Sequence, residues 1–141
     1  MRLREVEQEV IREFAMFENW EERYEHLITL GKALPRIAEI DRTENKLIKG
    51  CQSQVWLNAH MEKNRIFLQA DSDAILPRGI AALMARVYSG CLPHEITSSE
   101  AIFISEIGLK EFLSPTRSNG MVAMLKQIKF YAMVFEMKAS V

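Results

Sequence analysis

The sequence predicts a mixed α/β protein of the α+β type, in which a small three-stranded antiparallel sheet packs on helices. Near both ends of the chain, apolar residues recur every three or four positions, which is typical of amphipathic helices. Between these regions, apolar and polar residues alternate with the period of a β-strand. A sheet of three strands needs a helical layer over its apolar face, and the flanking helices are available for that role.

Length and composition indicate one ordinary globular domain over residues 1–141. The chain has 48% hydrophobic and 26% charged residues, and its formal net charge is -1. A nearly neutral chain has no strong bulk attraction for nucleic acid or for an anionic membrane. The sequence shows no secretory signal and no apolar run of about 18 residues that would span a membrane. We therefore expect a cytoplasmic protein whose two cysteines remain free thiols.

Two helices are predicted at the start of the chain. Over residues 3–17 the apolar positions fall on one helical face. Asn19, followed three residues later by Glu22, resembles a capping box and predicts the start of a second helix. Pro35 ends this helix at or before Leu34, because the residue before a proline disfavours helical backbone angles.

The middle of the chain is predicted to form the sheet. Its three strands are expected at residues 46–49, 53–60 and 65–70. Gly50 favours a chain reversal between the first two strands, because glycine adopts positive φ angles at little cost. The polar run Glu62-Lys63-Asn64 supplies the second turn. This arrangement puts Cys51 on a turn.

Helices are predicted for the rest of the chain. Within the acidic run Asp71-Ser72-Asp73, Ser72 or Asp73 is predicted to be the N-cap of a central helix that ends near Gly90, in preference to a metal site. Short helices follow, up to Ser114-Pro115. The last helix is expected at residues 120–137 after a polar loop at 116–120, and its methionines and aromatic residues are expected to pack in the core.

Metal binding and acyl-transfer catalysis are the first alternatives for the cysteines and histidines. The candidate ligands lack the close Cys-x-x-Cys or His-x-x-x-His pairs from which metal sites usually start; they are Cys51, Cys91, His26, His60 and His94. A cysteine nucleophile would need a histidine within reach. His60 lies too far along the same predicted strand, whereas His26 and His94 stay open, so a cysteine hydrolase remains a weak alternative. Cys91 is interpreted as a small buried apolar residue.

Thiol-sulfur chemistry is the remaining role for Cys51. An unperturbed thiol with a pKa near 8.5 is only about 3% thiolate at pH 7, and nearby cations increase that fraction. The candidate cations are Lys46, Lys49 and Arg117. Polar neighbours favour partial exposure of the thiol; they are Gln52, Ser53 and Gln54.

The cysteine segment resembles the active-cysteine segment of the SufE/CsdE family of sulfur-acceptor proteins. That segment is Gly50-Cys51-Gln52-Ser53-Gln54-Val55-Trp56-Leu57. Further segments are similar to the family in the same order, namely Asn19-Trp20-Glu21-Glu22-Arg23-Tyr24, Leu30-Gly31-Lys32-Ala33-Leu34-Pro35, Asp71-Ser72-Asp73-Ala74, Val87-Tyr88-Ser89-Gly90, Gly108-Leu109 and Leu113-Ser114-Pro115-Thr116-Arg117-Ser118-Asn119-Gly120. The resemblance covers most of the chain, from about Phe17 to the last helix.

The resemblance implies a fold similar to the scaffold proteins of iron-sulfur assembly, and a role in sulfur transfer. Cys51 is then expected to accept persulfide sulfur from a cysteine desulfurase, to stimulate that enzyme and to deliver the sulfur to an iron-sulfur scaffold protein. The chain itself is expected to hold no cofactor and no metal, because pyridoxal phosphate belongs to the desulfurase. Gly50, Gln52, Ser53, Gln54 and Arg117 are expected to support the cysteine loop or to contact the partner.

Two alternatives to a sulfur carrier stay open at this point. In one, the protein is a non-catalytic module that regulates a desulfurase or scaffold without accepting sulfur. In the other, Cys51 is the nucleophile of a hydrolase. A sulfur carrier, by contrast, is expected to be an accessory protein that stimulates a desulfurase and that does not turn over a small molecule on its own. Apolar neighbours such as Trp56 are expected to shelter a persulfide on Cys51 between partners.

Overall fold

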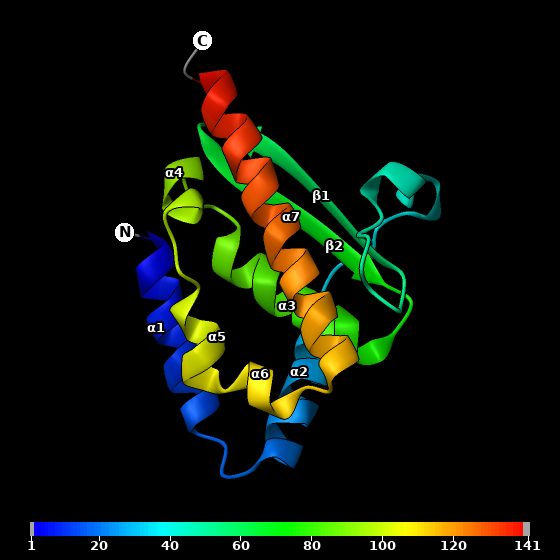
Figure 1. Cartoon of the computed structure of the whole chain (residues 1–141), viewed down its shortest axis with the longest axis vertical. Helices are drawn as coiled ribbons and strands as arrows, with labels where there is room; N and C mark the ends of the chain where they lie inside the picture. The colour runs from blue at the N-terminus through cyan, green and yellow to red at the C-terminus, as the bar shows by residue number, and fades with distance from the viewer. Residues whose placement is uncertain (1, 140–141) are drawn as a thin grey trace.

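The computed structural model describes residues 2–139, and within them helices pack against a single antiparallel hairpin (Figure 1). The two strands are β1 (Val55–Glu62) and β2 (Arg65–Ser72). The helices are α1 (Arg2–Ala15), α2 (Trp20–Ala33), α3 (Ile75–Tyr88), α4 (Pro93–Thr97), α5 (Ile102–Ile107), α6 (Leu109–Phe112) and α7 (Pro115–Ala139), with 3-10 helices η1 (Glu39–Asp41) and η2 (Glu44–Lys46). No helix among the described residues is long and apolar enough to cross a membrane.

The predicted start of α2 is confirmed in atomic detail. The Asn19 side chain caps the helix by accepting a hydrogen bond from the Glu22 amide at 2.9 Å. The Glu22 carboxylate accepts in turn from the amide of Glu18 at 3.1 Å. The helix ends at Ala33, and Leu34 takes the extended conformation that precedes Pro35.

The sheet has two strands instead of the three predicted. β1 and β2 pair from Val55↔Ser72 to Glu62↔Arg65, and their turn places Lys63 and Asn64 at φ 52° and 68°. The predicted first strand at 46–49 is wrong. Its Leu47 forms only an isolated bridge to Trp56, because 3-10 helix η2 occupies the start of the segment. Gly50, at φ +93°, turns the chain beyond it.

The acidic run before α3 stabilises the fold in a different way from the predicted helix cap. Asp71 is fully buried, and its carboxylate accepts from the Ile37 amide at 2.9 Å and from the Arg42 guanidinium at 2.8 Å. Arg78 lies 3.4 Å from the other carboxylate oxygen. The N-cap of α3 is Ala74, which has no side-chain cap. The prediction that Ser72 or Asp73 caps this helix is therefore wrong, because Ser72 is the last residue of β2 and the Asp73 carboxylate accepts from the backbone amide of Gln54.

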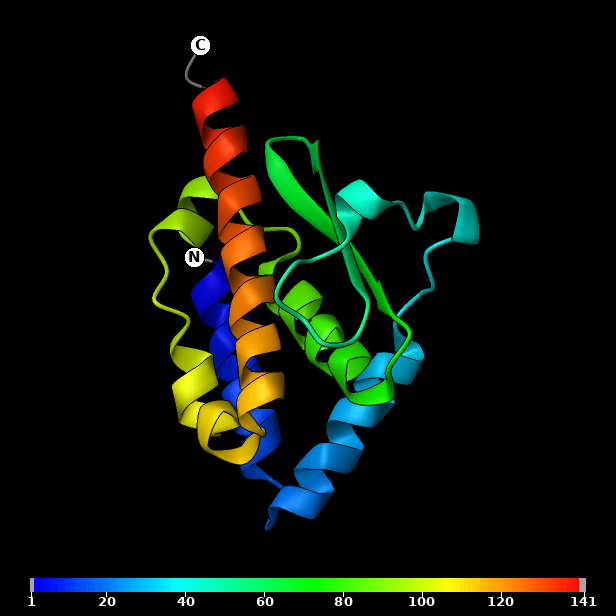
Figure 2. The same cartoon turned by 45° about the vertical axis from the view of Figure 1, so that its right-hand side comes forward.

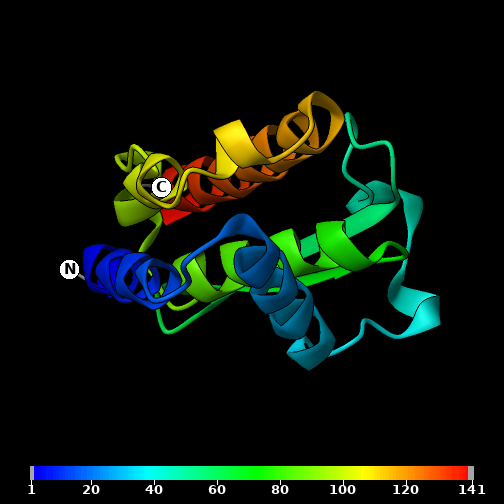
Figure 3. The same ribbon diagram turned by 90° about the horizontal axis from the view of Figure 1, so that it is seen from below.

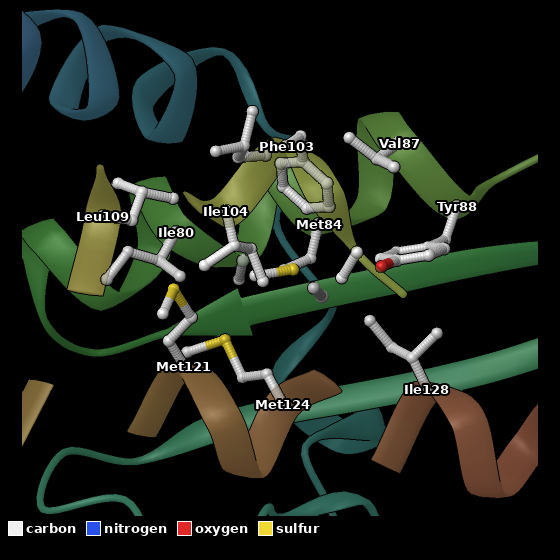
Figure 4. Close-up of a cluster of buried hydrophobic side chains, with 14 of the residues drawn as sticks. Ile80, Met84, Val87, Tyr88, Phe103, Ile104, Leu109, Met121, Met124 and Ile128 are labelled. Carbon is white, nitrogen blue, oxygen red and sulfur yellow. The ribbon is translucent and has the colours of Figure 1, made fainter. Parts of the chain in front are cut away.

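The core lies between two layers that are visible when the molecule is viewed from below (Figure 3). α7 lies on one side, and α3 with the hairpin lies on the other. Apolar side chains from α3, α5, α6 and α7 meet between them (Figure 4). Met121 and Met124 are both buried there, as predicted for the methionines at the start of the last helix.

Helix α7 differs from its prediction at both ends. It begins at Pro115 and so includes the expected loop at 116–120, because proline at a first helical position favours helix initiation. Farther along, side chains expected to be packed are exposed. Their exposed fractions are 52% for Phe130, 47% for Met133 and 64% for Met137.

Helices α2 and α3 approach each other closely through two glycines. A Cβ atom on Gly79 would lie 2.3 Å from the Leu27 carbonyl oxygen, and one on Gly31 would lie 2.8 Å from the Gly79 nitrogen. No side chain fits at either position without moving the helix backbone. This contact fixes α2 against α3 and so positions the two walls of the site described next.

Candidate functional site

Cys51 lies in the loop between η2 and β1, beside the first turns of α7. Its side chain is partly buried, and Sγ lies 3.6 Å from the carbonyl oxygen of Gly120, toward which the thiol donates. A Cβ atom on Gly120 would lie 3.4 Å from this sulfur. The absence of a side chain at Gly120 therefore leaves room for Cys51 to approach the helix.

The sulfur faces a cavity of about 610 Å³ lined by residues of α2, the cysteine loop and the N-terminal ends of α3 and α7. Most of the wall is apolar. The lining residues are Tyr24, Ile28, Cys51, Gln52, Ser53, Asp73, Ala74, Ile75, Leu76, Pro77, Ile80, Thr116, Arg117, Gly120 and Met124. A cavity of this size has space for at least one additional sulfur atom on Cys51.

The structure brings together most of the site residues predicted from the sequence. Gln52, Ser53 and Arg117 line the same cavity as Cys51. Gln54 lies at the end of the loop, where its backbone amide donates to the Asp73 carboxylate at 3.1 Å. The loop is thus tied at its end nearest β1, while Gln52 and Gln54 keep exposed side chains.

Burial, and not a neighbouring cation, dominates the electrostatics of Cys51. Desolvation raises the pKa of the Cys51 thiol above that of an exposed thiol. The expectation that Lys46 and Lys49 lower this pKa is therefore wrong for the structure as it stands. Both lysines line a different hollow, on the other side of the loop. At rest, Cys51 is a protonated thiol.

Arg117 is the only arginine or lysine that lines the cavity among the described residues. Its side chain is exposed, and its backbone amide donates to Ser114 Oγ at 3.4 Å. Within residues 2–139, no carboxylate forms an ion pair with its guanidinium. Arg117 therefore remains available to interact with a negative charge that enters the cavity.

The second cysteine occupies a different environment. Cys91 is completely buried next to β2, and burial raises the pKa of its thiol to about 12. Its Sγ lies 3.5 Å from the Val87 carbonyl oxygen. The prediction that Cys91 is a small buried residue is confirmed, and this thiol has no access to a reaction partner.

No histidine lines the Cys51 cavity in the described part of the chain. His26 instead contacts the Glu13 carboxylate at 2.6 Å, and His60 lies 3.6 Å from Glu62. The geometry therefore gives no support to a cysteine-histidine nucleophile. The described residues also contain no group of three or more His, Cys, Asp or Glu side chains placed to hold a metal ion.

Two features of the site differ from the expectations drawn from the sequence. Trp56, expected as a shelter for Cys51, is buried against Arg42 and is absent from the cavity wall. The shelter comes instead from α2, α3 and α7, through residues such as Tyr24 and Met124. The position of Gly120 beside the sulfur was not predicted. Ser114-Pro115, interpreted as the start of a helix, would have placed Gly120 on that helix, six residues after the serine.

Comparison with known proteins gives consistent results along most of the chain. The model of the family described as "SufE: Fe-S metabolism associated domain" matches residues 8–132. An uncharacterized SufE-like protein of Rhizobium etli is 43% identical over 131 aligned residues, and the match covers 89% of this chain and 88% of that protein. An uncharacterized SufE-like protein of Rhizobium meliloti is 40% identical over 126 residues, covering 86% and 90% of the two chains.

The fold also has a counterpart among solved structures. The solution structure of a hypothetical protein from Thermus thermophilus matches with a TM-score of 0.78 and covers 94% of this chain and 96% of that one. The two sequences are 19% identical, so this similarity concerns the fold alone. Helices and an antiparallel sheet in the predicted α+β arrangement are therefore confirmed.

Proposed function

The chain belongs to the SufE family of iron-sulfur metabolism, and from this premise we propose that it is a sulfur carrier whose Cys51 accepts persulfide sulfur from a cysteine desulfurase. It then delivers the sulfur to an iron-sulfur scaffold protein. The observation that carries this proposal is the position of Cys51, a partly buried thiol on a loop that faces a largely apolar cavity. The family places the protein in iron-sulfur metabolism, and the cavity supports sulfur as the cargo.

The transfer is a thiol-persulfide exchange that balances without an external oxidant or reductant. The Cys51 thiolate attacks the outer sulfur of the desulfurase persulfide, and a new sulfur-sulfur bond forms as the old one breaks. The desulfurase cysteine leaves as a thiolate and takes up the proton that Cys51 gives up. Cys51 then carries the persulfide, and a second exchange passes the outer sulfur to the scaffold.

The resting site favours storage over attack. Burial keeps Cys51 protonated, and a thiol is a much weaker nucleophile than a thiolate. Attack therefore requires the loop to leave the cavity when the desulfurase binds, which removes the desolvation that raises the pKa. Gly50, at φ +93°, is the loop residue best suited to change conformation.

After transfer, the apolar wall protects the product. When the loop returns, Tyr24, Ile28 and Met124 cover the persulfide and keep other thiols away from it. Arg117, at the cavity edge, offsets the negative charge of a persulfide or thiolate. The pyridoxal phosphate of the reaction belongs to the desulfurase, and Cys51 needs no cofactor in this chain for the exchange.

Desulfurase turnover separates a carrier from a module that only regulates. Cysteine-dependent sulfide release is measured with reductant present, in the desulfurase alone and after addition of the wild-type, Cys51→Ser or Cys91→Ser protein. A carrier stimulates turnover only when Cys51 is intact, and Cys91→Ser stimulates like the wild type. Equal stimulation by Cys51→Ser would show that the protein regulates the enzyme without accepting sulfur.

A further inference from the structure

A second hollow lies on the opposite side of the cysteine loop, between the 44–50 segment and α7. It is an open groove of about 1230 Å³, and Gly50 forms part of its rim. Figure 2 shows the loop that follows η2 as it passes beside α7. Because Gly50 and Cys51 are consecutive residues, a molecule bound in this groove lies next to the reactive thiol.

The groove is positively charged although the whole chain is not. Three lysines line it, namely Lys46, Lys49 and Lys126, together with one acidic residue, Glu44. Three positive charges minus one negative charge give +2, whereas the net charge of the chain is -1. None of these four side chains forms an ion pair within residues 2–139. The lysines are thus free to interact with a bound anionic group.

The groove also offers an apolar surface at one end. Phe130 lines it with 52% of its surface exposed, and Met133 and Met137 continue the exposed apolar strip three and seven residues farther along α7. Exposed methionine and aromatic side chains next to a polar groove are typical of protein-binding surfaces. A ligand that matches the groove therefore combines carboxylates with an apolar side chain.

We propose that this groove is the docking site for an acidic segment of the donor desulfurase that also carries an apolar anchor residue. The inference rests on the proposed function, because it identifies the groove's occupant with the sulfur donor. A donor that docks in this groove lies next to the thiol that must attack its persulfide, because Gly50 lines the groove and Cys51 is the next residue. An acidic peptide is favoured over nucleic acid because the chain as a whole has a net charge of -1 and an exposed apolar strip continues the groove.

Binding of the purified desulfurase tests the proposal through matched charge reversals. One variant combines Lys46→Glu, Lys49→Glu and Lys126→Glu. The control combines Lys32→Glu, Lys63→Glu and Lys110→Glu, three exposed lysines outside the groove that give the same change in net charge. We expect the groove variant to bind roughly tenfold more weakly at low salt, and the control to bind within about twofold of the wild type.

Salt and the apolar anchor refine the test. The difference between the groove variant and the wild type should shrink at high salt, because Lys49 and Lys126 are exposed, Lys46 is only partly buried, and salt screens such charges. Phe130→Ala should weaken binding with little salt dependence. Equal desulfurase affinity of the groove variant and the wild type would overturn the proposal. Binding to a single-stranded oligonucleotide is measured in parallel, and a groove variant that loses this binding but keeps its desulfurase affinity would also overturn the proposal.

The result is distinguishable from a failure of the proposed function. Persulfide on Cys51 is measured in the same samples at saturating desulfurase, where the groove variant should reach the wild-type level. If the wild type acquires persulfide but the groove variant binds normally, only the docking site is wrong. If the wild type binds through the groove but acquires no persulfide, the docking site stands and the carrier function is wrong.

Discussion

The glycine that faces Cys51 gives a direct test of the site geometry. We predict that Gly120→Ala makes the protein more stable and yet disturbs the cysteine. In a helix interior, alanine is favoured over glycine by about 0.5–1 kcal/mol. The new Cβ would lie 3.4 Å from Cys51 Sγ, which is at the short end of ordinary van der Waals contact. A loop side chain relieves such a contact with a shift of a few tenths of an ångström, so the gain in stability should remain.

A larger side chain at the same position should expel the sulfur. In Gly120→Leu, the added atoms occupy the place of Cys51 Sγ, and the thiol moves toward solvent. Its pKa then falls back toward the ordinary value, because the present elevation comes from burial. Each unit of decrease raises the thiolate fraction below the pKa about tenfold.

Two measurements check these expectations. Chemical denaturation should show a higher free energy of unfolding for Gly120→Ala, and alkylation by iodoacetamide at pH 7.5 should be fastest in Gly120→Leu. Peptide mapping separates Cys51 from Cys91, which is buried and should react only in unfolded protein. Identical alkylation rates in the wild type and both variants would refute the placement of the sulfur against α7.

Three other perturbations probe the fold and the thiol. Gly79→Ala should lower the free energy of unfolding by about 1–3 kcal/mol in denaturation experiments, because its Cβ would lie 2.3 Å from the Leu27 carbonyl oxygen in a fixed helix. Asp71→Asn should destabilise by about 3 kcal/mol at neutral pH, because it leaves Arg42 without its buried partner. Burial acts to raise the pKa of Asp71, but hydrogen bonds from two backbone amides and from Arg42 outweigh it, so the folded pKa is lower than the unfolded value. The stability that the ionised Asp71 carboxylate contributes is therefore present above the unfolded pKa and is lost as pH falls through the folded pKa. The free energy of unfolding, measured from pH 5 downward, should fall less in Asp71→Asn than in the wild type. Finally, wild-type alkylation of Cys51 should keep rising as pH increases beyond 9.0, whereas a plateau below pH 8 would contradict the raised pKa.

Local patterns in the sequence predicted the elements whose formation depends on local interactions. The capping box at Asn19 and Glu22 identified the start of α2 because both partners lie within one helical turn. The alternating run at 53–60 identified β1 because one face of the hairpin is buried. Residue patterns selected Cys51 and offered Arg117 as a nearby cation, and the family resemblance added sulfur transfer as their role. The fold brings both residues to one cavity although they lie 66 positions apart.

The features that could not be predicted from the sequence depend on distant contacts. The 46–49 segment has β-prone residues, but its partner strand accepts only a single bridge before Gly50 turns the chain. Ser72 and Asp73 resemble helix caps in the sequence, but in the structure both side chains form hydrogen bonds with the backbone of Gln54, 18 and 19 positions earlier. Likewise, the pKa of Cys51 is raised by burial beside helices that are remote in sequence, so lysines near it in the sequence did not predict the direction of the shift.

Mass spectrometry of the cysteine peptide tests the central claim most directly. The protein is incubated with desulfurase and cysteine, digested without reductant, and the peptides that contain Cys51 and Cys91 are compared. A sulfur carrier should show the mass of one additional sulfur atom on the Cys51 peptide, and the addition should disappear in Cys51→Ser but persist in Cys91→Ser. Absence of this sulfur, or its presence on Cys91, would contradict the assignment of Cys51 as the sulfur acceptor.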